Sequence, residues 1–264
     1  MTPDGIYHDM PESVYRADPA LSYSRIKLAT RTLAEYRYAV DNPKPPTNAM
    51  IVGTLTDRLV FGFDLMEGCE IKPEPRAPAG WRESVIAAGK TPVTSDLLET
   101  AKGCAASIKA HRGAMHLLKG RYGVSMFLTL PSGVRVKCRA DCISDSVSDC
   151  IVDLKKCQDA SPARDGRHPD WAYKSQDLGY HIQAGLYLHV WNALAGTENP
   201  RTKWAHVLVE EDPPNLVAVK QMSDAAIDAG RELAFRLIDR ITEAEKTGKW
   251  PGYPNDVEVF ELPR

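Results

Sequence analysis

The sequence predicts an α/β or mixed α+β fold, in which helices flank a central mixed β-sheet. Two observations support this prediction. Helix-like segments come first along the chain, followed by three strands, a helix, two more strands and a final helix. In addition, residues 134–143 (VRVKCRADCI) alternate between apolar and polar side chains, as a strand with one covered face does.

The composition is that of an ordinary globular protein. The chain has 264 residues, of which 43% are hydrophobic and 26% charged, enough for a substantial core. We expect one domain over residues 1–264, with an irregular lead-in at 1–20 and a tail at 247–264. No apolar run reaches the roughly 20 residues that a membrane span needs. The start is polar and acidic and none of the six cysteines forms a C-x-x-C pair, so we expect a cytoplasmic protein without disulfides.

The first half of the chain is predicted to be mainly helical. Residues 21–40 carry a rough apolar stripe, and a breaker at 41–47 separates them from a second helix at 48–62. A proline-rich loop at 71–82 and a weaker helical region at 93–119 follow.

The second half is predicted to hold the sheet. Residues 124–130 and 134–143 flank a Pro-Ser-Gly turn and form a hairpin. The remaining elements are a strand at 150–155, a helix at 171–194, strands at 203–210 and 215–222, and an amphipathic helix at 223–246.

Two carboxylates and a lysine fall on neighbouring strands of this sheet. Asp153 and Lys155 lie two residues apart, so they share a face, and Asp141 converges on them if the strands pair. Paired carboxylates are hard-oxygen ligands for Mg²⁺ or Mn²⁺, and a bound metal ion can activate water for phosphodiester hydrolysis. The triplet D-x-K by itself is more often a surface ion pair, since so short a motif occurs by chance. The apolar strand before Asp153, the upstream Asp141, and Gln183 and Tyr187 on one helix face favour a site instead.

These motifs resemble those of the PD-(D/E)XK nuclease superfamily, and more closely its exonuclease VIII branch of phage-type recombination exonucleases. The segments that resemble it most are RAD at 139–141, DLK at 153–155 and GYHIQAGLY at 179–187. Three further segments fit the same order: SYSRIK at 22–27, GTLTD at 53–57 and WPGY at 250–253. The resemblance spans roughly residues 5–260 and implies a restriction-endonuclease-like core.

The resemblance also implies roles for individual residues. The metal ligands would be Asp57, Asp141, Asp153 and the Leu154 carbonyl, holding Mg²⁺ or Mn²⁺. Lys155 would be the catalytic lysine, and Gln183 and Tyr187 would border the site as part of the catalytic set. Asp57 departs from the pattern, because relatives have His or Glu there and the Asp side chain is shorter than that of Glu.

DNA contacts are expected from a local group of basic residues, because the net charge of −2 gives no overall basic signal. This group consists of Lys137, Arg139, Lys155, Lys156, Arg164 and Arg167. Ser161 and His181 can also donate to phosphate, although a lone helical histidine is more often structural. His168 lies in the same charged loop as Arg164.

The function that the resemblance implies is a Mg²⁺-dependent exonuclease acting on duplex DNA ends, 5′ to 3′, to leave single strands for recombination. Its partners would be a single-strand annealing protein and further copies of the chain in a ring, in a bacterial cell or encoded by its phage. Two alternatives stay open: a structure-specific endonuclease of the same fold, and a catalytically weak DNA-binding protein. The sequence has no P-loop, so no nucleotide cofactor is expected. Some relatives bind an iron–sulfur cluster through C-terminal cysteines, but no cysteine follows Cys157 here.

Overall fold

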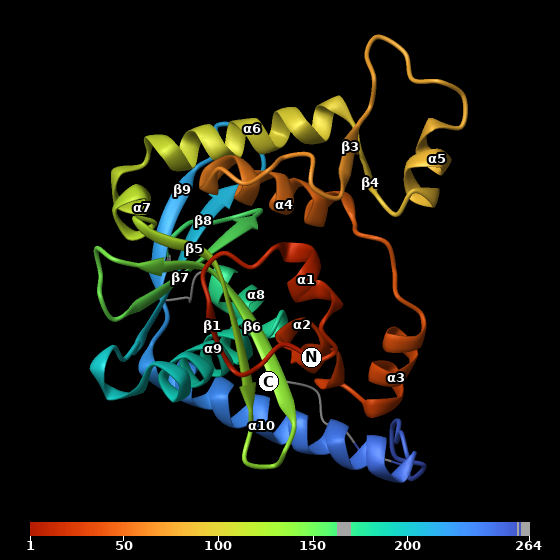
Figure 1. Ribbon diagram of the computed structural model, residues 1–264, viewed down its shortest axis with the longest axis vertical. Helices are drawn as coiled ribbons and strands as arrows, with labels where there is room; N and C mark the ends of the chain where they lie inside the picture. Colours follow the sequence, from red (N-terminus) through yellow and green to blue (C-terminus); the bar gives the residue numbers. More distant parts are fainter. Residues whose placement is uncertain (163–169, 258, 260–264) are drawn as a thin grey trace.

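The central element is a mixed β-sheet. The computed structural model describes residues 1–162, 170–257 and 259, and within them a seven-stranded sheet has the order β1-β5-β6-β7-β8-β9, with β2 paired to β6 (Figure 1). The pairs β2–β6 and β7–β8 are parallel and the others antiparallel. The strands are β1 (Gly5–Tyr7), β2 (Leu21–Ser22), β5 (Gly120–Thr129), β6 (Arg135–Ser144), β7 (Cys150–Cys157), β8 (Lys203–Glu210) and β9 (Val217–Gln221).

Helices cover both sides of the sheet, with α6 running along one side and α10 along the other (Figure 1). The helices are α1 (Glu12–Ala17), α2 (Tyr23–Ile26), α3 (Leu33–Asp41), α4 (Asn48–Phe61), α5 (Trp81–Ala87), α6 (Ser95–Ala110), α7 (Arg112–Leu117), α8 (Asp170–Asp177), α9 (Tyr180–Ala195) and α10 (Asp224–Thr247). Short 3₁₀ turns occur at Lys27–Ala29 and Gly196–Glu198, and β3 (Cys69–Ile71) pairs with β4 (Thr91–Val93) beside α5. The prediction of a mixed sheet flanked by helices is therefore confirmed.

Two apolar clusters fix the sheet between these helices. One cluster joins α9 and α10 to β5, β6, β7 and β8, with Ile182, Leu186 and Trp204 fully buried. The other joins the end of α4 and α6 to β7 and β8, with Val152 and Val207 fully buried. Because β7 and β8 contribute to both clusters, they are the buried centre of the sheet.

Three predicted helical segments are divided in the structure. The segment 21–40 begins in extended pairing with β6, and the second helix starts afresh where the Thr32 hydroxyl accepts from the Glu35 backbone N–H. The segment 171–194 is divided by Gly179, whose φ of 72° ends α8 and begins α9. The region 93–119 likewise divides at His111, whose ring nitrogen accepts from the Ala114 N–H.

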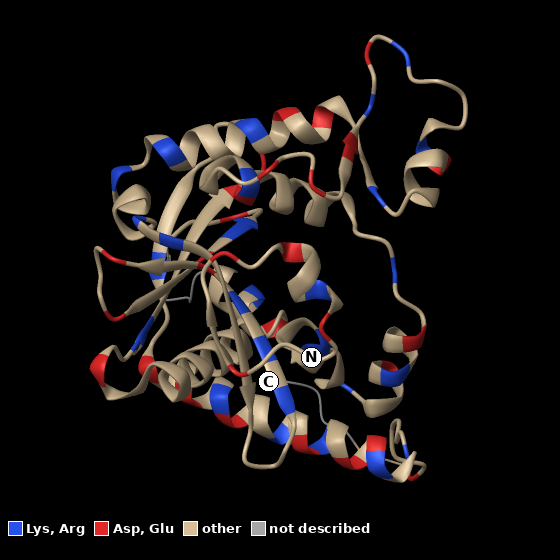
Figure 2. Cartoon of the chain, viewed as in Figure 1, with Lys and Arg blue, Asp and Glu red and all other residues tan. Residues whose placement is uncertain are grey.

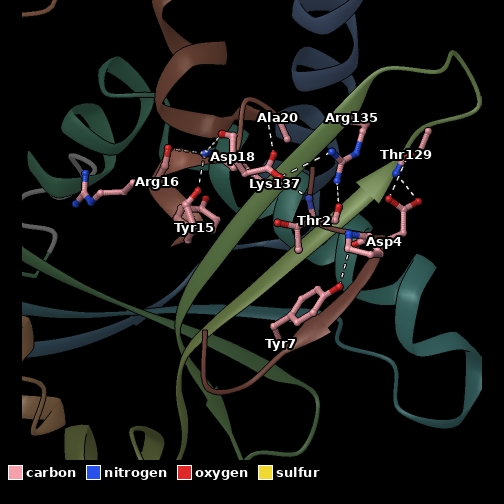
Figure 3. A network of polar contacts seen from close by, with 11 residues as sticks. Thr2, Asp4, Tyr7, Tyr15, Arg16, Asp18, Ala20, Thr129, Arg135 and Lys137 are labelled. Carbon is pink, nitrogen blue, oxygen red and sulfur yellow. Dashed lines mark hydrogen bonds and ion pairs between the residues drawn. The ribbon is translucent and has the colours of Figure 1, made fainter. Parts of the chain in front are cut away.

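The lead-in at 1–20 is ordered rather than irregular. It supplies β1 and α1 and is fixed by residues of the β5–β6 hairpin, as Figure 3 shows. The Lys137 ammonium donates to the carbonyls of Tyr15 (2.8 Å), Arg16 (3.3 Å) and Asp18 (2.6 Å). These bonds use all three hydrogens of a buried ammonium group, so Lys137 has a structural role here. Its contact with DNA stays a prediction.

No helix in the described part of the chain is long and apolar enough to cross a bilayer.

Candidate active site

The strands β6 and β7 separate where their acidic residues lie. Their ladder holds at Cys142–Val152 and Ile143–Ile151 and does not continue to Asp141 and Asp153. Instead, the Asp141 carboxylate accepts from the Leu154 backbone N–H at 2.9 Å. A side chain thus replaces the backbone carbonyl that a regular ladder would provide. Since the N–H and C=O of one strand residue point the same way, the Leu154 carbonyl also faces this opening.

Asp153 is buried and fully engaged by its neighbours. Its Oδ1 accepts from Lys155 Nζ (2.7 Å) and Gln183 Nε2 (2.8 Å), and its Oδ2 contacts Lys155 Nζ (2.7 Å) and His206 Nδ1 (3.1 Å). Burial raises the pKa of Asp153, but the Lys155 charge and the hydrogen bonds from His206 and Lys155 outweigh it and hold the pKa below its usual value. Asp153 is therefore ionised. To bind a metal ion, it has to release one of these partners.

Lys155 is a cation in this arrangement. Burial lowers its pKa, but the charges of Asp153 and Asp141 raise it by more, so the net shift is upward. Its ammonium also lies 5.2 Å from the centre of the Tyr180 ring. A lysine with a raised pKa does not act as a base at neutral pH; it supplies positive charge and hydrogen-bond donors.

Gln183 and Tyr187 lie on α9, as the i, i+4 spacing predicted, and face the strands. Gln183 gives its amide N–H to Asp153, while its buried Oε1 has no hydrogen-bond partner among the described residues. Tyr187 packs edge-on against Trp204, with 5.6 Å between ring centres, and borders the same cleft as Asp141. The unpartnered Oε1 is a buried acceptor that a water molecule or another donor would satisfy.

Asp57, on α4, lies opposite Asp141. Burial, followed by the charge of Asp141, raises the pKa of Asp57 well above its usual value. Burial and the charge of Asp153 raise the pKa of Asp141 to about 7. Both carboxyl groups are therefore destabilised as anions, and a bound cation would relieve the repulsion between them.

These residues fit a hard divalent cation by their chemistry. The donors are the carboxylates of Asp57 and Asp141 and the Leu154 carbonyl. In the described ranges, however, no three His, Cys, Asp or Glu side chains are already close enough to hold a metal ion. The metal roles of Asp57, Asp141, Asp153 and Leu154 therefore remain predictions.

The carboxylates open into a cleft of about 1200 Å³. Its walls come from the N-terminal segment, α4 and the β5–β6 hairpin, and Asp57, Asp141 and Tyr187 line it. Five arginines line it as well: Arg16, Arg25, Arg58, Arg121 and Arg139. Four acidic residues outside the site share the lining: Asp9, Glu12, Asp64 and Glu67. Figure 2 shows the same mixture of charges over the ribbon, so an attraction for DNA has to be local.

Two of the residues predicted specifically for DNA contact, Lys137 and Arg139, line this cleft. Arg139 lines it, with one guanidinium nitrogen bonded to the Met10 carbonyl (3.0 Å) and Ser125 Oγ (2.7 Å). Arg164, like Arg167 and His168, lies outside the described residues.

Three other residues predicted to contact DNA do not line this cleft. Lys156 alternates with Lys155 and so points to the other face of β7, where it pairs with Glu211. The Ser161 carbonyl accepts from Lys220 Nζ (2.9 Å), away from the cleft lining. His181 lines a separate cavity of about 520 Å³ near the start of α10. None of the three therefore lies beside the carboxylates.

His206 was missed at the sequence level. It lies opposite Asp153 in the parallel β7–β8 register. Its side chain is 2% exposed, so it contacts other protein groups rather than solvent. Trp204 Nε1 donates to His206 Nε2 at 3.3 Å, so that nitrogen carries no proton and Nδ1–H donates to Asp153. Strand alternation puts Trp204 and His206 on one face of β8, but it does not indicate which neighbour that face meets.

Comparison with protein families gives a match over nearly the whole chain. The model of a family described as "PDDEXK-like domain of unknown function (DUF3799)" matches residues 22–263. No curated protein sequence matches the chain.

Solved structures show the same fold. A crystal structure named "Putative exonuclease", from Eubacterium rectale, superposes with a TM-score of 0.66 and 16% sequence identity, covering 97% of this chain and 96% of that one. A second structure, SSO0001, has 15% identity over 78% of this chain and 84% of that one, but its TM-score of 0.28 is too low to support an argument. At such identities, the likeness concerns the fold alone.

Proposed function

Because the chain belongs to the family of PDDEXK-like domains of unknown function, we propose that it is a metal-dependent nuclease that hydrolyses phosphodiester bonds in DNA. One observation carries the proposal: where β6 and β7 separate, two carboxyl groups of raised pKa face a cleft beside the cationic Lys155. A bound metal cation would relieve the repulsion between the two carboxyl groups, and the Lys155 ammonium would attract an anionic phosphate.

Each residue has a distinct part in this proposal. Asp57, Asp141 and the Leu154 carbonyl would hold Mg²⁺ or Mn²⁺, with Asp153 joining them as Lys155 releases it. When bound, the metal ion supplies Lewis acidity and lowers the pKa of its water. The Lys155 ammonium stabilises the charge that develops on the phosphate oxygens. Gln183 Oε1 accepts a hydrogen bond from the attacking water and orients it, while its amide N–H keeps Asp153 in place.

A finer proposal concerns the substrate and its biological use. We propose an exonuclease VIII-like enzyme that digests duplex DNA from its ends, 5′ to 3′, and leaves single strands for an annealing recombinase. The motif order along the chain supports this branch, and the similar Eubacterium rectale structure carries the name "Putative exonuclease". Assembly into a ring would focus the field of the cleft arginines on the DNA, in the cytoplasm of a bacterial cell.

Digestion of two DNA substrates tests the proposal. Linear duplex and covalently closed circles are incubated with Mg²⁺, with Mn²⁺, or with EDTA. We expect metal-dependent loss of the linear DNA alone. The variant Asp141→Asn keeps an acceptor for the Leu154 N–H but loses the charge, and we expect its rate to fall at least about 100-fold. Asp149→Asn, remote from the cleft, is the matched control and should retain activity.

The outcomes separate the alternatives. Cutting of the closed circle would favour a structure-specific endonuclease of the same fold. Absence of cutting by a folded protein that still binds DNA would favour a catalytically weak DNA-binding protein. Full activity of Asp141→Asn, or full activity in EDTA, would contradict the assigned site.

A further inference from the structure

An aromatic wall borders the cleft on the side of α4. We define this wall as Phe61, Phe63 and Tyr122, with ring centres 6.0 Å apart for Phe61–Phe63 and 4.8 Å apart for Phe61–Tyr122. Phe61 is 8% exposed and anchors the group, whereas Phe63 is 39% exposed and presents its ring to the cleft. Exposure of a large apolar ring inside a cleft favours a ligand that covers it.

The Phe63 backbone is fixed rather than part of a loose loop. Both Gly62 N–H (2.9 Å) and Phe63 N–H (3.0 Å) donate to the Arg58 carbonyl, which closes the end of α4. Gly62 has a φ of 75°, in the left-handed region that this helix ending requires. An exposed ring on a fixed backbone loses little further freedom on binding, so it makes an efficient binding anchor.

The wall lies next to the carboxylates. Gly123 lies on β5 between the pairs Tyr122–Cys142 and Val124–Ala140, and therefore opposite Asp141. A Cβ at Gly123 would lie 3.1 Å from the tip of the Phe63 ring and 2.9 Å from a guanidinium nitrogen of Arg139. The side chains of Phe63 and Arg139 thus both lie against Gly123, the residue opposite Asp141.

The charges around the wall indicate which part of a nucleotide it would meet. Arg121, which is exposed, and Arg139 line the cleft beside Gly123 and suit phosphate oxygens. Asp64 and Glu67 line it on the side of Phe63, where they would repel phosphate. A neutral, flat base fits the ring of Phe63, while the backbone fits the side of the arginines.

We propose that Phe63 stacks on an unpaired nucleobase of the DNA strand being cut. This proposal rests on the proposed nuclease function and specifies its substrate: the strand enters the cleft unpaired, as a single strand or a frayed duplex end. The base next to the scissile phosphate leaves its partner and lies on Phe63, while Arg121 and Arg139 contact the backbone. Base–aromatic stacking does not depend on which base is present, so the site would read strand separation rather than sequence.

A double-mutant cycle between protein and DNA tests this contact. Short single-stranded oligonucleotides carry one abasic nucleotide at each position in turn, and their binding is measured by fluorescence anisotropy in EDTA, which prevents hydrolysis. With the unaltered protein, we expect one position where loss of the base weakens binding about tenfold. With Phe63→Ala, binding of the intact strand should be weaker by a similar factor, and the abasic change at that position should cost nothing more.

Three further variants keep the test open if one of them misfolds. Phe63→Trp retains a stacking surface and should retain the coupling, whereas Phe63→Leu is apolar without a π-face and should lose most of it. Tyr38→Ala removes a more exposed aromatic ring (66% exposed) on α3, away from the cleft, and should behave as the unaltered protein. Thermal unfolding of each variant confirms that it is folded.

The results distinguish this contact from the nuclease function itself. Additive losses from Phe63→Ala and the abasic change, at every position, would overturn the stacking proposal. If the unaltered protein hydrolyses DNA while Phe63→Ala binds and cuts single strands equally well, only the stacking proposal fails. If the unaltered protein neither binds nor cuts DNA, the proposed function itself fails.

Discussion

At the scale of single residues, the site is a set of carboxyl groups with opposed pKa shifts. Asp153 is held ionised by Lys155 and His206, while burial and neighbouring anions raise the pKa of Asp57 and Asp141. The site therefore holds one ionised carboxylate, Asp153, beside two carboxyl groups, Asp57 and Asp141, whose ionisation is unfavourable. Opposed pKa shifts of neighbouring carboxyl groups are typical of functional sites, where strongly perturbed pKa values cluster.

The raised pKa of Asp141 predicts how stability depends on pH without metal. The folded state holds the proton up to about pH 7, whereas the unfolded chain releases it near the ordinary value of 3.8. Between pH 3.8 and about pH 7 the folded state binds more protons than the unfolded chain. The contribution of Asp141 to stability is therefore fully present below pH 3.8 and is lost as the pH rises to about 7. In EDTA, we therefore expect Asp141→Asn to be more stable than the unaltered protein at pH 8, by about 1–3 kcal/mol, and by a smaller margin at pH 5, which lies inside this interval.

Chemical denaturation at both pH values measures this difference. The control is Asp149→Asn, because the hydrogen bond from Lys203 lowers the pKa of Asp149, and its loss should not stabilise the protein. Added Mg²⁺ should stabilise the unaltered protein at pH 8 more than Asp141→Asn. Equal stability of Asp141→Asn and the unaltered protein at pH 8 would refute a raised pKa at this position.

His206 is predicted to act as a positioning residue for Asp153. In His206→Asn, the side-chain amide nitrogen occupies the place of Nδ1 and can still donate to Asp153, whereas in His206→Gln it occupies the place of Nε2 and cannot. If the contact positions Asp153, His206→Gln should raise the Mg²⁺ concentration for half-maximal cleavage about tenfold, and His206→Asn much less. A purely structural role would instead lower the unfolding temperature of both without shifting the metal dependence.

At the scale of elements, α9 carries Gln183 and Tyr187 and owes its position to a close crossing with α10. A Cβ on Gly185 of α9 would overlap the backbone of Arg231, and a Cβ on Gly230 of α10 would overlap the His181 carbonyl. The backbones of the two helices are thus in direct contact at Gly185 of α9, two residues from Gln183, and at Gly230 of α10. The crossing transmits any displacement of α10 directly to the amide that holds Asp153.

Substitution of two helical glycines tests this crossing. Gly230→Ala should push α9 from α10 and reduce stability by about 2 kcal/mol or more, because neither backbone can yield cheaply. Gly53→Ala, in α4, meets no atom within 4 Å and should stabilise the protein by about 0.5–1 kcal/mol through helix propensity. Denaturant unfolding measures both, and a neutral Gly230→Ala would show that the helices do not meet in this way.

The sequence predicted most elements but not their interruptions. Hydrophobic periodicity located α4, α10 and the β5–β6 hairpin, because each is long and strongly patterned. It joined α8 to α9 because Gly179 has helical neighbours on both sides, and only tertiary packing decides whether such a glycine bends the chain. The extended start at Leu21–Ser22 depends on pairing with β6, a contact between distant parts of the chain that no local pattern shows.

The same limit explains which site residues were predicted. Asp141, Asp153 and Lys155 follow from strand alternation and spacing, so they were found, and Gln183 followed from its helical spacing. His206 depends on a parallel register set by the intervening helices, and Lys137 depends on what covers its face of β6. Alternation tells which residues share a face, but it does not tell whether that face meets solvent, a ligand or another part of the chain.

At the scale of the whole molecule, the N-terminal segment completes both the sheet and the cleft. Its strand β1 extends the sheet beside β5, and Glu12 of α1 reaches Arg58 of α4 at 3.5 Å. Met10 accepts from Arg139 and Tyr15 lies against the same guanidinium, 5.8 Å from its ring centre. The first part of the chain therefore forms one wall of a cleft whose carboxylates come from residues far along the sequence.

Lys137 holds this segment, so its replacement should release it without unfolding the core. Lys137→Met keeps the apolar stem but leaves the carbonyls of Tyr15, Arg16 and Asp18 without their donor. Because unpartnered buried acceptors cost about 1–3 kcal/mol, local opening of residues 1–20 should become more frequent by about one to two orders of magnitude. Native-state hydrogen exchange or limited proteolysis detects this opening, and DNA cleavage should slow because Met10 no longer orients Arg139. Lys109→Met, an exposed lysine of α6, is the control. If the segment stayed as protected in Lys137→Met as in the unaltered protein, its attachment would have to come from its other contacts, such as the β1–β5 pairing and the bond from Arg139 to Met10.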